Sequence, residues 1–178
     1  LIKDENIIAA VQEERFSRIK HDSSFPKQSI KYCLEEAKIS IEQINYFAFY
    51  DKPLIKFERL LETYLTEAPK GLKSFLLSIP IWLKEKLYLK KTLINQLTKI
   101  FEDQYLNCNS KSLKIFKNQL SKKIMFGEHH LSHSASAFFP SPYEESAILT
   151  IDGVGEWTTT SLSYGKKNKI KILKEIHF

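Results

Sequence analysis

Cysteine and glycine are scarce in this chain of 178 residues, which holds 2 cysteines and 5 glycines. The low glycine content, with 12% aromatic and 43% hydrophobic residues, argues against intrinsic disorder and leaves enough apolar material for a core. Cys33 and Cys108 lack the spacing of a metal or redox motif. They predict a protein of the reducing cytoplasm.

Long apolar runs are also missing. The most apolar stretch, residues 75–83, is far too short to span a bilayer and contains Pro80, so no membrane partner is expected. A glycine-rich P-loop is absent from the sequence, which excludes a Walker-type nucleotide site. The chain opens without a methionine and stops within a strand-like run, and we therefore expect a fragment that lacks both ends.

The positive charge is unevenly distributed. The formal net charge is +6, yet residues 70–123 hold twelve lysines against Glu85, Glu102 and Asp103. Such a segment could contact RNA, but lysine without arginine clusters is also typical of a solvated helical face. We favour the solvated face, and a nucleic-acid partner is not expected.

Apolar runs alternate with helix-like periodicity and predict an α/β domain. Residues 7–11 predict a buried strand, and Pro26 is expected to open a helix with Ser24 as its N-cap. Residues 54–120 predict a helical insert, broken at residues 69–71 and at Pro80, within one partial domain over residues 1–178. Further strands are expected at residues 46–50, 123–127, 146–151, 158–164 and 169–176, the last two as a hairpin.

Three of the five histidines lie within five residues, at His129, His130 and His133. The segment is predicted to be a helix that ends before Pro140, and residues four apart share one face of a helix. Neutral imidazoles at that spacing can hold one metal ion, so His129 and His133 are candidate ligands. His130 stands where a metalloprotease helix carries its glutamate, which argues against a protease. The alternative is that the histidines only pack beneath the proline-rich loop.

A carboxylate and two glycines follow a predicted buried strand in the sequence Asp152-Gly153-Val154-Gly155-Glu156. Asp152 is the third candidate ligand, because two histidines and a carboxylate with open positions suit Fe(II) or Zn(II). Gly153 and Gly155 would let backbone amides approach a phosphate closely. The competing interpretation is a turn without a ligand.

Three or four positive side chains gather after the first predicted strand, at Arg15, Arg18, Lys20 and His21. Arginine forks onto phosphate or carboxylate, so this cluster could hold an anionic substrate. Salt bridges to Glu13 and Glu14 explain the same cluster equally well.

The order of these motifs closely resembles the N-terminal domain of the ATP-dependent O-carbamoyltransferases of antibiotic and nodulation-factor biosynthesis. The matching segments are residues 9–22, 25–26, 129–138 and 152–156, and the resemblance covers most of the chain outside residues 54–120. It implies an actin-like, ribonuclease-H-like α/β domain with a mixed sheet, flanking helices and a helical insert, truncated at both ends.

The resemblance also implies an activity. A second domain is expected to make carbamoyl-adenylate from carbamoyl phosphate and ATP, and the actin-like domain to pass the carbamoyl group to a substrate hydroxyl. His129, His133 and Asp152 are implied to hold a divalent metal, with Fe2+ favoured, that acts as a Lewis acid. Lys20 is implied to be catalytic, because its charge can stabilise developing negative charge. The residues implied to contact the adenylate are Lys20, Asp152, Gly153, Val154, Gly155 and Glu156.

Parts of the family pattern are not in this chain: the general-base histidine, a further aspartate ligand and the adenylate-forming domain. We therefore expect the chain to be inactive alone. Two other interpretations stand beside carbamoyl transfer, namely a non-catalytic truncated remnant that binds metal or nucleotide, and a basic RNA-binding module. His130 is interpreted as a support for the ligands or as packing at the helix end.

Overall fold

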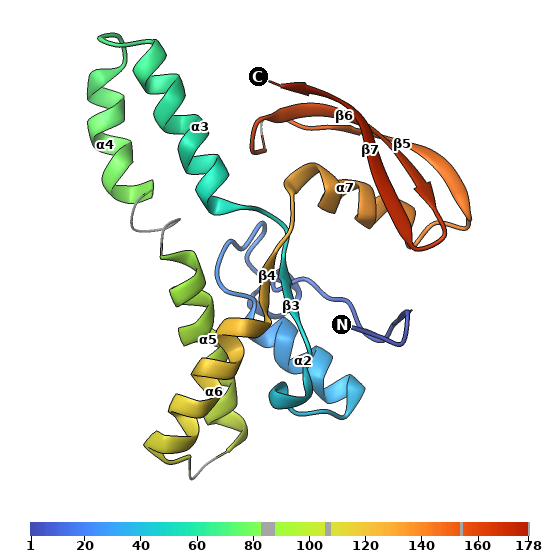
Figure 1. Cartoon of the computed structure of the whole chain (residues 1–178). Helices are drawn as coiled ribbons and strands as arrows, with labels where there is room; N and C mark the ends of the chain where they lie inside the picture. The colour runs from blue at the N-terminus through green and yellow to red at the C-terminus, as the bar shows by residue number, and fades with distance from the viewer. Residues whose placement is uncertain (83–87, 106–107, 154, 178) are drawn as a thin grey trace. The chain divides into compact units, whose positions relative to one another are not determined.

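The computed structural model of the chain describes residues 1–82, 88–105, 108–153 and 155–177 (Figure 1). The chain divides into two units, one made of Leu1–Phe47 and Lys90–Lys123, the other of Ala48–Leu89 and Ile124–Phe178. Helices and short sheets both contribute, which confirms the predicted mixed α/β class. None of the helices in the described residues combines the length and the apolar content needed to cross a membrane.

The first unit is mainly helical. Its core forms where α5 buries one face, at Leu97, Ile100 and Phe101, which recur at helical spacing. Phe101 stacks on Phe116 of α6, with 4.2 Å between the ring centroids. The elements of this unit are β1 (Ile2–Lys3), β2 (Asn6–Ile7), α1 (Glu14–Ser17), α2 (Lys27–Ala37), the 3-10 helix η1 (Ile41–Gln43), α5 (Leu89–Gln104) and α6 (Ser110–Lys123).

The predicted buried strand over residues 7–11 is wrong. β2 ends at Ile7, which is 59% exposed, and of the five residues only Ala9 is buried. β1 and β2 form a two-residue antiparallel ladder, and the β1–β2 turn carries positive φ angles at Asp4 and Glu5. An apolar run becomes a buried strand only when a sheet or helix covers it, and the described residues place no such layer over this hairpin.

A carboxylate from outside the helix caps the N-terminus of α2. The backbone N–H groups of Gln28 and Ser29 donate to the Glu13 carboxylate at 3.0 and 2.8 Å. The prediction that Ser24 caps this helix is wrong, because Pro26 occupies the N-cap position and the free N–H groups donate to Glu13. A carboxylate satisfies free N–H groups as a hydroxyl would, and its charge also interacts favourably with the positive end of the helix dipole.

The second unit contains two sheets. β3 (Phe47–Phe49) and β4 (Ile124–Phe126) form a two-stranded sheet. β5 (Glu145–Ile151), β6 (Thr158–Lys166) and β7 (Lys169–His177) form an antiparallel sheet in that order. The predicted hairpin is therefore confirmed, and the strand predicted at residues 146–151 forms, although its residues alternate between buried and exposed instead of being buried throughout.

Helices α3 (Pro53–Thr66), α4 (Leu72–Trp82), α5 and α6 confirm the helical character predicted for residues 54–120 where these are described. The predicted break at residues 69–71 separates α3 from α4, but the one at Pro80 is wrong, because Pro80 lies inside α4. Tyr64 and Phe75 pack edge to face across α3 and α4, with 5.0 Å between the ring centroids. The assignment of residues 1–178 to one partial domain stays a prediction.

Helix α7 (His129–Phe138) packs on one face of the three-stranded sheet (Figure 1). The residues that it buries, His130, Ser134 and Phe138, recur every four positions and so form one stripe. A Cβ at Gly165 of β6 would lie 2.8 Å from the Phe138 ring. Glycine at this position therefore lets the end of the helix approach the sheet.

The Glu13 cap makes the stability of the first unit depend on pH. Partial burial works to raise the pKa of Glu13, but hydrogen bonds from Ser29 and Gln28 outweigh it and leave the pKa below its usual value. At pH 7, Glu13→Ala should lower the free energy of unfolding by about 1 to 2 kcal/mol, as loss of an N-cap does. Glu13→Gln, which keeps an acceptor, should cost less. Urea unfolding followed by circular dichroism measures both.

The pH dependence has a definite sign. Because folding lowers the pKa of Glu13, its contribution is present above the usual carboxyl pKa and is lost as the pH falls through the lowered value. The difference in stability between wild type and Glu13→Ala should therefore shrink in acid. A difference that stays constant from neutral pH to about pH 3 would contradict the cap.

Candidate metal centre

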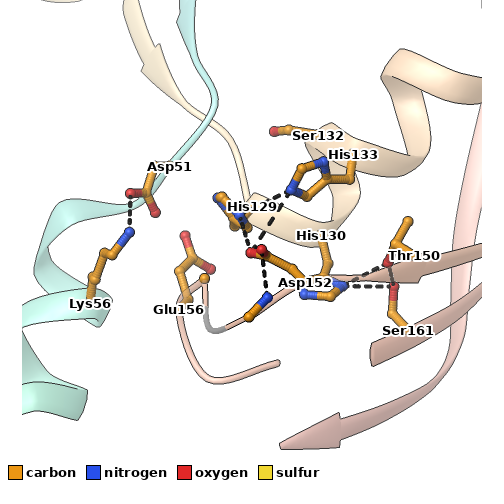
Figure 2. Close-up of polar contacts among 12 residues, drawn as sticks. Asp51, Lys56, His129, His130, Ser132, His133, Thr150, Asp152, Glu156 and Ser161 are labelled. Atoms are coloured by element: carbon orange, nitrogen blue, oxygen red, sulfur yellow. Dashed lines mark hydrogen bonds and ion pairs between the residues drawn. The ribbon is translucent and has the colours of Figure 1, made fainter. Parts of the chain in front are cut away.

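Two histidines of α7 direct their Nε2 atoms toward each other (Figure 2). His129 and His133 are four residues apart on the helix, and their Nε2 atoms lie 3.1 Å apart. The side chain of His129 is 11% exposed, whereas that of His133 is 49% exposed. The pair therefore has one closed side and one side open to solvent.

Asp152 completes the group from the end of β5. Its Oδ2 atom lies 2.8 Å from Nε2 of His129 and 4.0 Å from Nε2 of His133. One ligand atom from each of the three residues lies within 4.8 Å of the others. The Asp152 backbone N–H donates to the carbonyl of Thr159, and its Oδ1 accepts a hydrogen bond from the Gly153 N–H at 2.7 Å. The structure thus brings together the three residues that the sequence selects as ligands.

The chemistry of these donor atoms fits a divalent metal. Two imidazole nitrogens and a carboxylate oxygen are ligands that Zn(II) and Fe(II) accept. Burial works to raise the pKa of Asp152, but hydrogen bonds from Gly153 and His129 outweigh it, so the pKa lies below its usual value and favours the ionised, metal-binding form. Two facing Nε2 atoms cannot both act as acceptors toward each other, whereas both can donate a lone pair to one cation.

His130 belongs to the neighbouring face of α7 and is buried against the sheet. Its Nδ1 lies 2.7 Å from the Thr150 hydroxyl of β5 and 3.2 Å from the Ser161 hydroxyl of β6. Burial lowers the pKa of His130, so the imidazole is neutral at pH 7. His130 therefore joins the helix to both strands.

The two glycines after Asp152 have different surroundings. A Cβ at Gly155 would lie 2.7 Å from Cγ of His129, so the imidazole occupies the space that a side chain would need. No heavy atom lies within 4 Å of a Cβ built at Gly153. Gly155 thus makes room for a ligand residue, while Gly153 leaves open space beside the carboxylate. Val154 lies outside the described residues.

Glu156, which the sequence assigns to the adenylate site, is buried. One of its carboxylate oxygens accepts a hydrogen bond from the Lys52 backbone N–H at 2.7 Å. Burial raises the pKa of Glu156 above its usual value. This hydrogen bond joins the turn after β5 to the segment between β3 and α3.

Sequence reasoning missed three polar residues near this turn. Asp51 is 3% exposed and forms an ion pair with Lys56 of α3, with 3.3 Å between Oδ2 and Nζ (Figure 2). Arg59, also on α3, donates to the Gly155 carbonyl at 3.3 Å. The only available signal was the helical spacing of Lys56 and Arg59 after a strand that ends in aspartate. No local pattern connects them with residue 155.

Lys20 belongs to the first unit, where it is exposed in the turn after α1. The alternative for the neighbouring cluster, salt bridges to Glu13 and Glu14, is met among the described residues by one ion pair, Arg15–Glu14. Glu13 caps α2, Glu14 accepts a hydrogen bond from the His21 backbone N–H at 3.0 Å, and Arg15 approaches Glu14 only to 4.0 Å. The role of Lys20 stays a prediction.

Comparison with known proteins identifies the family. This chain, with its mixed α/β fold and its group of two histidines and one carboxylate, matches the sequence family described as carbamoyltransferase N-terminus over residues 1–178. The chain belongs to this family, which confirms the resemblance found in the sequence.

Three relatives show how far the similarity extends. Over its whole length the chain is 53% identical to an uncharacterized protein of Synechocystis sp., of which it covers 27%. It is 34% identical to nodulation protein NolNO of Sinorhizobium fredii over 97% of its length, which is 22% of that protein. It is 26% identical to an uncharacterized protein of Methanocaldococcus jannaschii over 98% of its length, which is 24% of that protein. The chain spans about a quarter of the length of these curated relatives.

The two glycines provide a matched pair of variants. Gly155→Ala should displace the His129 ring and lower the free energy of unfolding by about 1 to 3 kcal/mol, the usual cost of overpacking. Gly153→Ala should change it by less than about 0.5 kcal/mol, because its Cβ meets open space. Thermal unfolding of both variants measures the difference. Equal effects at the two positions would contradict the packing of His129 on Gly155.

Proposed function

We propose that the chain is part of an O-carbamoyltransferase, which transfers a carbamoyl group from carbamoyl-adenylate to the hydroxyl of a small-molecule acceptor. The observation that supports this most directly is the convergence of His129, His133 and Asp152 in a chain of the carbamoyltransferase N-terminus family. The adenylate is made from carbamoyl phosphate and ATP by an adenylate-forming domain of a longer cytoplasmic protein.

In this proposal His129, His133 and Asp152 hold a divalent metal, with Fe2+ as the first candidate. When bound, the metal supplies a Lewis acid that polarises the mixed anhydride of the adenylate. Asp152 is oriented by the Gly153 N–H, and His129 by its contact with Gly155. The half-exposed His133 leaves its side of the group open to a ligand.

The segment Asp152-Gly153-Val154-Gly155-Glu156 lines the adenylate phosphate in this proposal. The open space at Gly153 supports a close approach there. Glu156 is buried and holds the turn in place, because its carboxylate accepts a hydrogen bond from the Lys52 N–H. Lys20 supplies a positive charge that stabilises the negative charge developing on the reacting carbamoyl group.

The RNA-binding alternative stays a prediction. Among the residues of the chain it is supported by the lysine excess of residues 70–123, and exposed lysines on α5 and α6 attract any polyanion. The carbamoyl-transfer proposal has in addition the family match and the geometry of the three ligand residues.

Variants of the full-length protein separate the metal site from the transfer step. His133→Ala should weaken metal binding at least about tenfold, because one of three protein donors is lost. Asp152→Asn should do the same while the fold is retained, since the Gly153 turn is still permitted. Lys20→Ala should keep the metal content and slow transfer by about 100-fold. Metal analysis of the purified protein and a carbamoylation assay measure the two properties.

The outcomes are distinct. If His133→Ala keeps both its metal and its rate, the ligand assignment is wrong. If Lys20→Ala loses as much metal as Asp152→Asn, the separate role of Lys20 is wrong.

A further inference from the structure

We propose that His130 is a positioning residue that fixes the register of α7 on the sheet, so that His129 faces Asp152. This inference rests on the proposed function, because it concerns the residues assigned as metal ligands. It differs from that assignment, since His130 is not one of the three proposed ligands and its Nδ1 is engaged by Thr150 and Ser161.

The contact is a closed triangle of polar atoms. His130 Nδ1 lies 2.7 Å from the Thr150 hydroxyl and 3.2 Å from the Ser161 hydroxyl, and the two hydroxyls lie 2.6 Å apart (Figure 2). The exposed fractions are 3% for His130, 8% for Thr150 and 0% for Ser161. Hydrogen bonds in such a buried site are directional and costly to break, so they tolerate little sliding of the helix.

This triangle is coupled to the ligand group through two short covalent paths. On α7, His130 is the residue after His129. On the other side Thr150 lies two residues before Asp152, whose N–H continues the β5–β6 ladder by donating to Thr159. Residues two apart along an extended strand lie on the same face. Joining His130 to Thr150 therefore places His129 opposite Asp152, at 2.8 Å.

The sensitivity of this arrangement follows from helix geometry. A shift of α7 by one residue moves its side chains about 1.5 Å along the axis and about 100° around it. Such a shift would break the His129–Asp152 contact completely. The close packing of Phe138 on Gly165 limits movement at the far end of the helix, and the His130 triangle defines the register next to the candidate ligands.

Burial of His130 is difficult to explain by packing alone. A buried imidazole without partners is destabilising, and an aliphatic side chain would fill the same volume without that cost. Among the described residues its Nε2 atom makes no hydrogen bond of ordinary geometry, although the Thr158 backbone acts on the imidazole as a hydrogen-bond acceptor, so the good hydrogen bonds of this side chain are those of Nδ1. A positional requirement accounts for this choice.

The test uses the full-length protein and four substitutions. His130→Leu removes the polar contact, and Thr150→Val removes one partner while keeping the shape of the side chain. His130→Asn is the conservative variant, because its amide can reach the position of Nδ1. Ser134→Ala is the matched control, since it removes another buried hydrogen bond of α7, to Ser163 at 3.3 Å, one turn further from Asp152.

Two measurements are made on each variant. The first is the affinity for Co2+, with the visible spectrum of the bound ion as a report on its coordination. The second, on metal-free protein, is the 15N spectrum of the imidazole of His129, which reports its contact with Asp152. Thermal unfolding is recorded alongside, so that loss of stability can be compared with loss of position.

We expect His130→Leu and Thr150→Val to weaken Co2+ binding about 10- to 100-fold and to alter its spectrum, as loss of a residue that orients a metal ligand does. His130→Asn should stay within about threefold of wild type, and Ser134→Ala should lower the melting temperature without changing the affinity. The inference is overturned if Thr150→Val binds Co2+ like wild type, or if Ser134→Ala weakens binding as much as His130→Leu.

Failure of the proposed metal site can be told apart from failure of this inference. If wild type binds no metal, the ligand assignment fails, and the metal-free spectra then decide the role of His130. A shift of the His129 resonances in His130→Leu and Thr150→Val, but not in Ser134→Ala, supports positioning. Unshifted resonances in all of them overturn it.

Discussion

The contact of α7 with the β5–β6–β7 sheet is the constraint on which the candidate site depends. The helix has two adjacent stripes, because residues four apart share a face. One stripe, His130, Ser134 and Phe138, is buried on the sheet. The other, His129 and His133, meets the carboxylate at the end of β5. Since the stripes are offset by one residue, the way the first is seated determines where the second points.

The sheet side of this contact is equally constrained. Asp152 follows β5 directly, and its backbone N–H extends the ladder with β6, so its carboxylate has little freedom to move away from the helix. Gly155 then brings the chain back beneath the His129 ring, and Arg59 of α3 holds the Gly155 carbonyl. His129 is therefore confined between its own helix and the turn that follows Asp152. Preorganisation of this kind reduces the ordering that binding of a ligand would require.

Local periodicity was sufficient to predict those parts of the structure whose causes are local. The His129–His133 spacing predicts a shared helical face, and alternating residues predict the β6–β7 hairpin. The buried strand predicted at residues 7–11 is wrong, because an apolar run does not reveal whether another layer of the protein covers it. Likewise the cap of α2 comes from Glu13, which lies outside the helix and beyond the residues that a local capping pattern considers.

The polar contacts of the turn after β5 were beyond sequence reasoning for a related reason. The backbone of Lys52 and the carboxylate of Glu156 are 104 residues apart, and the Arg59–Gly155 contact spans 96 residues. No periodicity connects such positions, because their meeting depends on how α3 and the sheet pack. Asp152 was selected for a different reason: a carboxylate and two glycines after a strand form a motif that can be recognised without its partners.

The surroundings of the two glycines divide the turn into a structural half and an open half. Gly155 and Glu156 are buried and are engaged by His129, Arg59 and Lys52, so in the proposed function they hold the turn in place around the phosphate. Gly153 has free space at the position of a side chain, next to a carboxylate whose Oδ2 is directed at the histidines. The Asp152 carboxylate alone would repel an anionic ligand. A cation bound between the carboxylate and the ligand would turn this repulsion into attraction. In the proposed function the space beside Gly153 therefore suits a phosphate once a cation compensates the charge of Asp152.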